Sequence, residues 1–121
     1  MKVPEERPLV SRVIWNRLLA GWKLGVDASV CYLPEISCQG LLQSQLDDTS
    51  NAWNTRANFG LPPTPIAAPG EAALEPALAP ADGEWMYYEL RDEDGNHTFA
   101  VTDEEFAAAK AECERLGLGC G

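Results

Sequence analysis

Few residues in this chain have the chemistry of a catalytic or metal site, apart from its acids. The 121-residue sequence contains 1 histidine and 4 cysteines. A serine triad needs a histidine base, and His97 opens a strand-like run, where a cross-strand packing role is expected. The run GLPPTP (residues 60–65) lacks the lysine and the strand–helix context of a phosphate loop. The sequence therefore predicts no cofactor and no metal site.

The cysteines fall into two local pairs with equal spacing, 31 with 38 and 113 with 120. Neither spacing matches the short gap of a zinc knuckle, and one histidine does not complete a Cys/His ligand set. Four cysteines allow three pairings. We favour the bridges Cys31–Cys38 and Cys113–Cys120, which would pin a loop and the C-terminal tail. Free buried thiols are the alternative.

Most acidic runs have a structural explanation. The run Asp92–Asp94 belongs at the tip of a predicted hairpin, where its side chains would be solvated. The run Asp103–Glu105 lies at a predicted helix N-terminus, where negative charge is electrostatically favourable.

Polar side chains next to aromatic rings are the remaining binding candidates. Amide and hydroxyl groups beside aromatic faces suit an uncharged or weakly charged polyol, such as a sugar chain. These candidates are Asn16, Arg17, Asp27, Tyr32, Trp53, Asn54 and Thr55.

The elements that must position these residues predict a mixed α+β fold in one domain, residues 1–121. Apolar residues at helical spacing predict a helix over Glu6–Ala20. The segment Lys23–Leu33 alternates weakly and is predicted to be extended, whereas Gly40–Asp48 is predicted to hold a short helix. A further helix is expected to start near residue 69, although Pro76 would shorten or kink it.

An irregular loop, Trp53–Gly70, occupies the middle of the chain. Its four prolines exclude a helix and a central strand. Its Trp, Phe, Leu and Ile are uncommon in a plain linker and indicate an ordered loop.

The last third of the sequence predicts a β-hairpin followed by a helix. Two strand-like runs, Glu84–Leu90 and His97–Val101, are joined by a loop with an Asp-Gly pair typical of hairpin turns. Thr102 is a predicted N-cap with Glu105 at the capping-box position, and Gly117 is a predicted stop. The apolar stripe of this helix is Phe106, Ala109, Cys113 and Leu116.

Composition limits the partners. The hydrophobic content of 45% is enough to bury a core. The net charge of −10 at pH 7 disfavours nucleic acid and an anionic membrane surface. No apolar run approaches the roughly 18 residues that span a bilayer, and no signal peptide opens the chain.

Five segments follow one another along the chain: ERPLVSRVIWNRL, KLGVDASVCY, WNTRANFGLPPTPIAAPG, ALAPADGEWMYYEL and GNHTFAVT. In their order and spacing they resemble the YceG-like family, the MltG-type endolytic murein transglycosylases of bacterial cell envelopes. The resemblance covers nearly the whole chain, from about Glu5 to Ala108.

The resemblance implies cleavage of the glycosidic bond between N-acetylmuramic acid and N-acetylglucosamine in nascent glycan strands. One glutamic acid protonates the leaving oxygen and then acts as base, while a hydroxyl of the sugar attacks and leaves a 1,6-anhydro end. The resemblance also implies a location at the extracytoplasmic face of the bacterial membrane, with cell-wall synthases as a second class of partner.

The family's catalytic glutamate belongs to a V-E-x-E helix upstream of the segment that matches ERPLV. The matching position would precede Met1, so we expect a C-terminal part of the catalytic domain that lacks the general acid and is inactive alone. Glu5 and Glu6 match the entry of the first helix and not the acid. The membrane anchor and the LysM-like module that family members usually carry upstream are likewise expected to be missing, so any membrane contact would depend on that anchor.

Two motifs depart from the family pattern. Residues 24–27 read L-G-V-D where the family commonly has L-Q-x-D, which removes an amide able to bind sugar. Residues 53–56 read W-N-T-R where Y-N-T-Y is common. Trp53 can still stack on a sugar face, and Arg56 adds a charge that could meet a peptide-stem carboxylate.

On this interpretation the central loop provides a binding surface, a stiff apolar wall that loses little entropy when a ligand binds. Asn54 and Thr55 would present hydrogen bonds from its rim. The alternative is a loop that only covers the core. The residues of the expected wall are Leu61, Pro62, Pro63, Pro65 and Ile66.

One other function is open, and a further one is disfavoured. A catalytically incomplete domain could hold glycan or a cell-wall synthase without cutting. A pyridoxal-phosphate lyase would need a lysine beside a glycine-rich phosphate cup, and Lys2, Lys23 and Lys110 have no such cup nearby.

Overall fold

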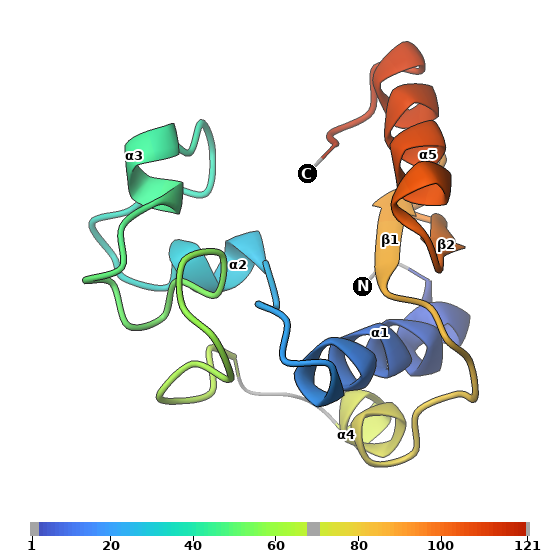
Figure 1. The fold of residues 1–121 in the computed structure, drawn as a ribbon, viewed down its shortest axis with the longest axis horizontal. Coiled ribbons are helices and arrows are strands. Elements are labelled where there is room, and N and C mark those ends of the chain that lie inside the picture. Colours follow the sequence, from blue (N-terminus) through green and yellow to red (C-terminus); the bar gives the residue numbers. More distant parts are fainter. Residues whose placement is uncertain (1–2, 68–70, 121) are drawn as a thin grey trace. The chain divides into compact units, whose positions relative to one another are not determined.

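The computed structural model describes residues 3–67 and 71–120, shown as a ribbon in Figure 1. Helices combine with a two-stranded antiparallel sheet, which is the predicted α+β class. The chain divides into two compact units. We call Met1–Asn16 with Pro69–Gly121 the hairpin unit, and Arg17–Ala68 the loop unit. The expectation that residues 1–121 form one domain stays a prediction.

Helix α1 (Arg7–Leu19) follows a short 3-10 turn, Pro4–Glu6, and confirms the first predicted helix. Arg12 lies three residues before Trp15 and four before Asn16, so these polar groups lie on the same side of the helix. Each donates to a backbone carbonyl of the segment that leads into the hairpin. These contacts are Arg12 Nε to Ala81 (2.5 Å), Trp15 Nε1 to Ala77 (3.1 Å) and Asn16 Nδ2 to Trp85 (2.9 Å).

Helix α4 (Glu71–Leu78) contains Pro76 in its last turn. Proline has no N–H to donate to the preceding turn, and the helix ends two residues later, as the sequence predicted for a helix shortened by proline. The predicted start near residue 69 lies outside the described residues.

Strands β1 (Tyr87–Leu90) and β2 (His97–Ala100) pair in antiparallel register, with Tyr88 opposite Phe99. The hairpin is therefore confirmed, with strands shorter than the predicted runs. Asp92 closes its loop, because one carboxylate oxygen accepts the backbone N–H groups of residues 94 and 96 at 3.0 and 3.1 Å. The expectation that the whole acidic run is merely solvated is wrong for Asp92.

Helix α5 (Asp103–Arg115) has the predicted capping box: the N–H of Glu105 donates to the Thr102 hydroxyl (3.2 Å), and the Thr102 N–H donates back to the Glu105 carboxylate (3.2 Å). Gly117, with φ of +70°, ends the helix as predicted. Its N–H and that of the next residue bond to carbonyls of the last turn, which is a Schellman motif. Leu116 is 46% exposed, so the predicted apolar stripe stops before it.

Helix α5 packs on the hairpin, as Figure 1 shows for the red helix beside the orange strands. The rings of Tyr87 and Phe106 stack with centroids 4.7 Å apart. Val13, Ala100 and Cys113 are at most 1% exposed and form the small apolar core of the hairpin unit.

The loop unit contains two short helices, α2 (Asp27–Val30) and α3 (Gln43–Leu46). Helix α3 confirms the short helix predicted within Gly40–Asp48. The prediction of an extended segment over Lys23–Leu33 is wrong from Asp27 onward. The Ser29 hydroxyl donates to the Val26 carbonyl at 2.7 Å and stabilises this single turn, although the residue types favour a strand.

The structure joins Cys31 to Cys38 and Cys113 to Cys120, with Cα atoms 5.3 and 6.0 Å apart. The first bridge closes a loop after α2, and the second holds the tail to the last turn of α5. Within the described ranges, no helix is long and apolar enough to cross a bilayer.

Replacement of the α5 cap gives a direct test of this local account. Thr102→Ala removes the hydroxyl that accepts the Glu105 N–H, and we expect a loss of about 1 kcal/mol in the free energy of unfolding. Lys110→Ala, an exposed change in the same helix, is the control and should be close to neutral. Equal urea midpoints for the Thr102→Ala variant and the parent chain would contradict the assigned role of the cap.

Candidate functional site

The side chain of Asn54 is the centre of the loop unit. It is 0% exposed. Its Nδ2 donates to the carbonyls of three residues around the end of α3, at 3.0, 3.1 and 3.0 Å, and its Oδ1 accepts the N–H groups of residues 56 and 57 at 3.0 and 3.1 Å. One amide therefore fixes both the chain after α3 and the start of the central loop.

Thr55 connects this loop to α2. It is 3% exposed. Its hydroxyl accepts the Val26 N–H at 2.9 Å and lies 2.8 Å from the Ser29 hydroxyl, while its carbonyl accepts the Gly25 N–H at 3.0 Å. Neither Asn54 nor Thr55 presents hydrogen bonds from the rim, contrary to the expectation, because their polar atoms are occupied inside the unit.

Two charged candidates form a pair. The Arg56 guanidinium donates to the Asp27 carboxylate, and both side chains are partly exposed. The expected free charge for a peptide-stem carboxylate is therefore already balanced by Asp27. Arg17 donates to the Leu24 carbonyl at 2.5 Å and so holds the chain where it leaves α1.

Exposed rings lie on the frame that Asn54 and Thr55 hold together. The rings of Tyr32 and Trp53 have centroids 5.6 Å apart, and Tyr32 is 41% exposed. The Trp53 indole N–H donates to the Thr64 hydroxyl at 3.0 Å, which ties the start of the central loop to its proline-rich part, Leu61–Ile66. Aromatic faces fixed in this way lose little side-chain entropy on binding.

The proline segment itself is accessible. Leu61 is 70% exposed, Pro63 is exposed and Pro62 is partly exposed, so these three predicted wall residues are available to a ligand. Phe59 is 71% exposed, and the Lys23 ammonium lies 5.1 Å from its ring centroid. Phe59 is not among the candidates predicted from the sequence, because the apolar residues of this loop were interpreted only as a sign of order. Its position beside Gly60, which has φ of +83°, is the local signal of a turn that exposes it.

The remaining sequence candidate, Asn16, belongs to the hairpin unit. Its Nδ2 donates to the carbonyls of Gly83 (3.1 Å) and Trp85 (2.9 Å), which gives it a structural role there. The candidate site accordingly consists of loop-unit residues. It comprises Tyr32, Trp53, Phe59, Leu61, Pro62 and Pro63, with Asn54, Thr55 and the Asp27–Arg56 pair as its support.

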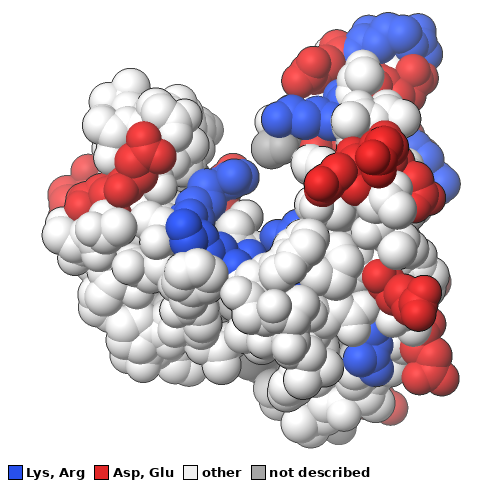
Figure 2. All heavy atoms as spheres, viewed as in Figure 1, with Lys and Arg blue, Asp and Glu red and all other residues white. Residues whose placement is uncertain are grey.

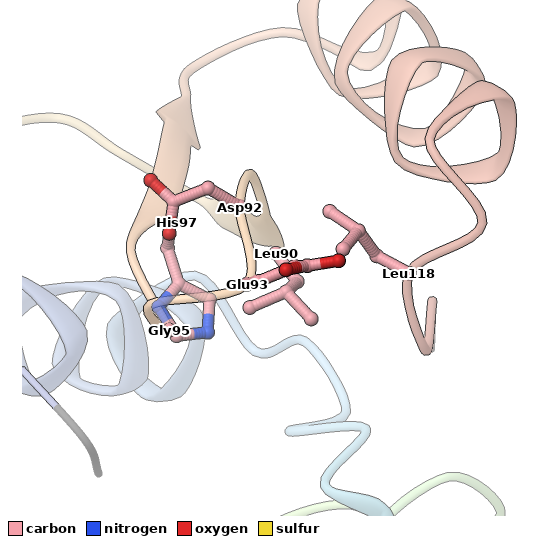
Figure 3. Close-up of a pocket in the computed structure, with 6 residues that line it drawn as sticks. All are labelled: Leu90, Asp92, Glu93, Gly95, His97 and Leu118. Atoms are coloured by element: carbon pink, nitrogen blue, oxygen red, sulfur yellow. The ribbon is translucent and has the colours of Figure 1, made fainter.

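The hairpin unit has a small pocket of about 200 Å³ beside His97. Figure 3 shows the side chains of Leu90, Glu93 and Leu118 converging next to the imidazole ring. His97 Nδ1 lies 3.0 Å from the Glu6 carboxylate, and the His97 N–H donates to both oxygens of Glu6 at 3.0 and 3.1 Å. With its ring also edge-on to Tyr88 (5.5 Å), His97 has the packing role that the sequence predicted.

The Asp92 carboxylate at this pocket already accepts hydrogen bonds from the hairpin loop. The hydrogen bond from the Asn96 side chain, with those from the loop backbone, holds the pKa of Asp92 below its usual value. The carboxylate is thus kept as a hydrogen-bond acceptor for the turn.

Carboxyl groups suited to general acid catalysis lie in apolar pockets. Among glutamates with described side chains, only Glu6 and Glu89 are buried. Glu6 is engaged with His97, and Glu89 accepts the N–H of its neighbour Leu90 at 3.1 Å. Both glutamates belong to the hairpin unit.

Known proteins share this arrangement of elements. A crystal structure of a YceG-like protein from Listeria monocytogenes superposes with a TM-score of 0.74 at 29% identity, covering 82% of this chain and 32% of that one. An endolytic murein transglycosylase of Bacillus subtilis (strain 168) is 32% identical over 105 residues, which are 87% of this chain and 29% of that protein. The chain thus spans about a third of the length of these relatives.

The sequence model of the YceG-like family matches residues 1–112. The chain belongs to the YceG-like family.

Asn54→Ala tests the central position of this amide. It removes the side-chain partner of three carbonyls and two N–H groups, so we expect the free energy of unfolding to fall by at least about 3 kcal/mol. Asn54→Asp should also destabilise strongly, because it keeps the size and removes the donors. Gln39→Ala, an exposed amide in the same unit, is the control. A urea midpoint for Asn54→Ala equal to that of Gln39→Ala would show that the amide is not a structural centre.

Proposed function

We propose that this chain forms the glycan-binding part of an endolytic murein transglycosylase, which cleaves between N-acetylmuramic acid and N-acetylglucosamine and leaves 1,6-anhydro ends. Membership of the YceG-like family and the similarity to the Bacillus enzyme support this reaction class. The observation that carries the binding role is the accessibility of the Tyr32, Trp53 and Phe59 rings in a unit fixed by a buried amide: Tyr32 and Phe59 are exposed and Trp53 is partly exposed.

The chemistry of this surface suits a glycan strand. Between residues 49 and 67, Arg56 is the one charged residue, and it is paired with Asp27. Sugar rings have apolar C–H faces that stack on aromatic rings. The rings of Tyr32, Trp53 and Phe59 could provide such aromatic partners. On the face seen in Figure 2, acidic side chains gather over α5 and over α3, whereas the lower part of the loop unit is largely uncharged.

The general acid of the reaction, on this proposal, is not one of the carboxyl groups described above. The sequence contains no V-E-x-E segment. Glu6 is engaged with His97, and Glu89 accepts the N–H of the adjacent Leu90. The other glutamates with described side chains are exposed, whereas a general acid is expected in an apolar pocket. The acid would come from a part of the catalytic domain outside these 121 residues, so this chain alone would bind glycan without cleaving it.

The reaction sets the location and the partners. Murein lies outside the cytoplasmic membrane, where the two local disulfides would persist. We place the chain at the extracytoplasmic face, acting on nascent glycan strands, with cell-wall synthases as a second partner class. A purely non-catalytic glycan-binding or synthase-binding module is the alternative function, and the experiments below distinguish it.

Binding is tested by replacing Tyr32 and Phe59, the exposed rings of the candidate site. Tyr32→Ala and Phe59→Ala should each weaken affinity for purified uncrosslinked glycan strands about tenfold, or about 1.4 kcal/mol, with unchanged unfolding midpoints. Leu42→Ala removes a 62% exposed apolar side chain elsewhere in the same unit and should leave affinity unchanged. Equal affinities for all three variants and the parent chain would contradict this binding surface.

Cleavage is tested by digesting the same glycan with this chain and with a version extended upstream through a V-E-x-E segment, scoring 1,6-anhydro ends by mass spectrometry. We expect products from the longer version only. Products from the short chain would show that the acid is misplaced and would direct attention to Glu5, Glu6 and Glu35. Glycan binding without products from either version would support the non-catalytic module.

A further inference from the structure

The tail of α5 brings three metal-ligating residues together. The carboxylate of Glu89 and the sulfur atoms of Cys113 and Cys120 all lie within 4.8 Å of one another. Glu89 comes from β1, Cys113 from the last turn of α5 and Cys120 from the tail that returns along it. The cysteine spacing alone does not predict a metal site, because the third ligand is contributed by a strand.

Glu89 is an unusual residue for its position. It is 5% exposed, and Cys113 beside it is 1% exposed. The only hydrogen bond found for its carboxylate within the described ranges is the one from the adjacent Leu90 N–H, at 3.1 Å. A buried carboxylate is costly unless a cation or several donors compensate it. The hairpin does not need this group for its ladder, so its burial next to two sulfur atoms is unexplained by the fold.

We propose that Glu89, Cys113 and Cys120 form a binding site for a thiophilic divalent metal ion, such as Zn²⁺, when the Cys113–Cys120 bridge is reduced. Two thiolates and a carboxylate are ligands that zinc accepts, with water in the fourth position. In tetrahedral coordination the sulfur atoms would be about 3.8 Å apart, given zinc–sulfur bonds of about 2.3 Å. The bridge would open to this separation by movement of the tail after Gly117.

The disulfide-bonded form and the metal-bound form exclude each other, because both use the sulfur atoms of Cys113 and Cys120. An external dithiol reductant passes two electrons and two protons to the Cys113–Cys120 bridge. This gives two cysteine thiols, and the reductant is itself oxidised to a cyclic disulfide. The metal ion then displaces the two thiol protons, and the buried Glu89 carboxylate supplies the third bond. The bound metal would in turn keep the thiols from re-forming the bridge.

The second disulfide provides an internal comparison. The Cys31–Cys38 pair has the same sequence separation of 7. Within residues 3–67 and 71–120, no third His, Cys, Asp or Glu joins it in a comparable cluster. A metal preference for one pair over the other would therefore report the contribution of Glu89.

The test is a Co²⁺ titration of the whole chain after reduction and removal of the reductant under argon. The Cys31→Ser/Cys38→Ser variant should bind one Co²⁺ with the visible absorption of thiolate coordination and release two protons. The Cys113→Ser/Cys120→Ser variant should not. Glu89→Gln in the first background should weaken binding by at least about tenfold, since loss of a ligand should cost no less than loss of a ligand's supporting contact. Equal Co²⁺ spectra from both double variants, or unchanged affinity in Glu89→Gln, would overturn the proposal.

A second readout covers the case in which reduction loosens the fold. Alkylation of the reduced parent chain, with Zn²⁺ present or absent, is mapped by mass spectrometry of peptides. We expect Zn²⁺ to slow alkylation of Cys113 and Cys120 at least about tenfold and to leave Cys31 and Cys38 unprotected. Equal protection of all four thiols, or protection of none, would contradict the site.

Discussion

The loop unit depends on one buried amide. Asn54 joins the end of helix α3 to the start of the central loop, because its Nδ2 and Oδ1 bond to five backbone groups at once. A segment with this much proline cannot use a helix or sheet ladder to pair its polar backbone. Side-chain amides and hydroxyls therefore replace the ladder, with contributions from Asn51, Asn54, Thr55 and Asn58. The apolar core is correspondingly small here, with Leu24 and Val30 as its buried members.

This constraint explains why residues of similar chemistry have different roles. Polar side chains of the W-N-T motif turn inward and hold the frame, while the rings at its surface stay accessible. A binding surface of this kind is preorganised, because prolines and fixed aromatics have few conformations to lose. In the hairpin unit the Glu6–His97 contact has an analogous function, joining the start of the chain to a strand 91 residues later. Both units thus use buried polar contacts over long sequence separations where apolar burial is limited.

Structural features fixed by neighbouring residues were predictable from the sequence, whereas features fixed by contacts between distant residues were not. The α5 cap, its glycine stop and the hairpin depend on neighbours within a few residues, so Thr102, Glu105 and Gly117 were identified correctly. The turn at α2 was missed because the residues that fix it include Thr55, 29 positions away from Val26. The inward orientation of the Asn54 and Thr55 side chains was missed for the same reason. The sequence shows that these side chains can form hydrogen bonds, but not whether they bond inside the unit or at its surface. Phe59 and Glu89 show the converse, an aromatic that is exposed and a carboxylate that is buried against the usual preference of their types.

The central claim is that the inner residues of the W-N-T motif hold the loop while the surface rings bind glycan. A titration of the isotope-labelled chain with uncrosslinked murein glycan fragments, followed by its amide NMR spectrum, tests both parts at once. The account predicts shifts of the Trp53 indole signal and of backbone amides in residues 56–66, with the Asn54 side-chain amide unshifted and slow to exchange with solvent. Shifts confined to the hairpin unit, or an Asn54 amide that exchanges rapidly and moves with added glycan, would contradict it.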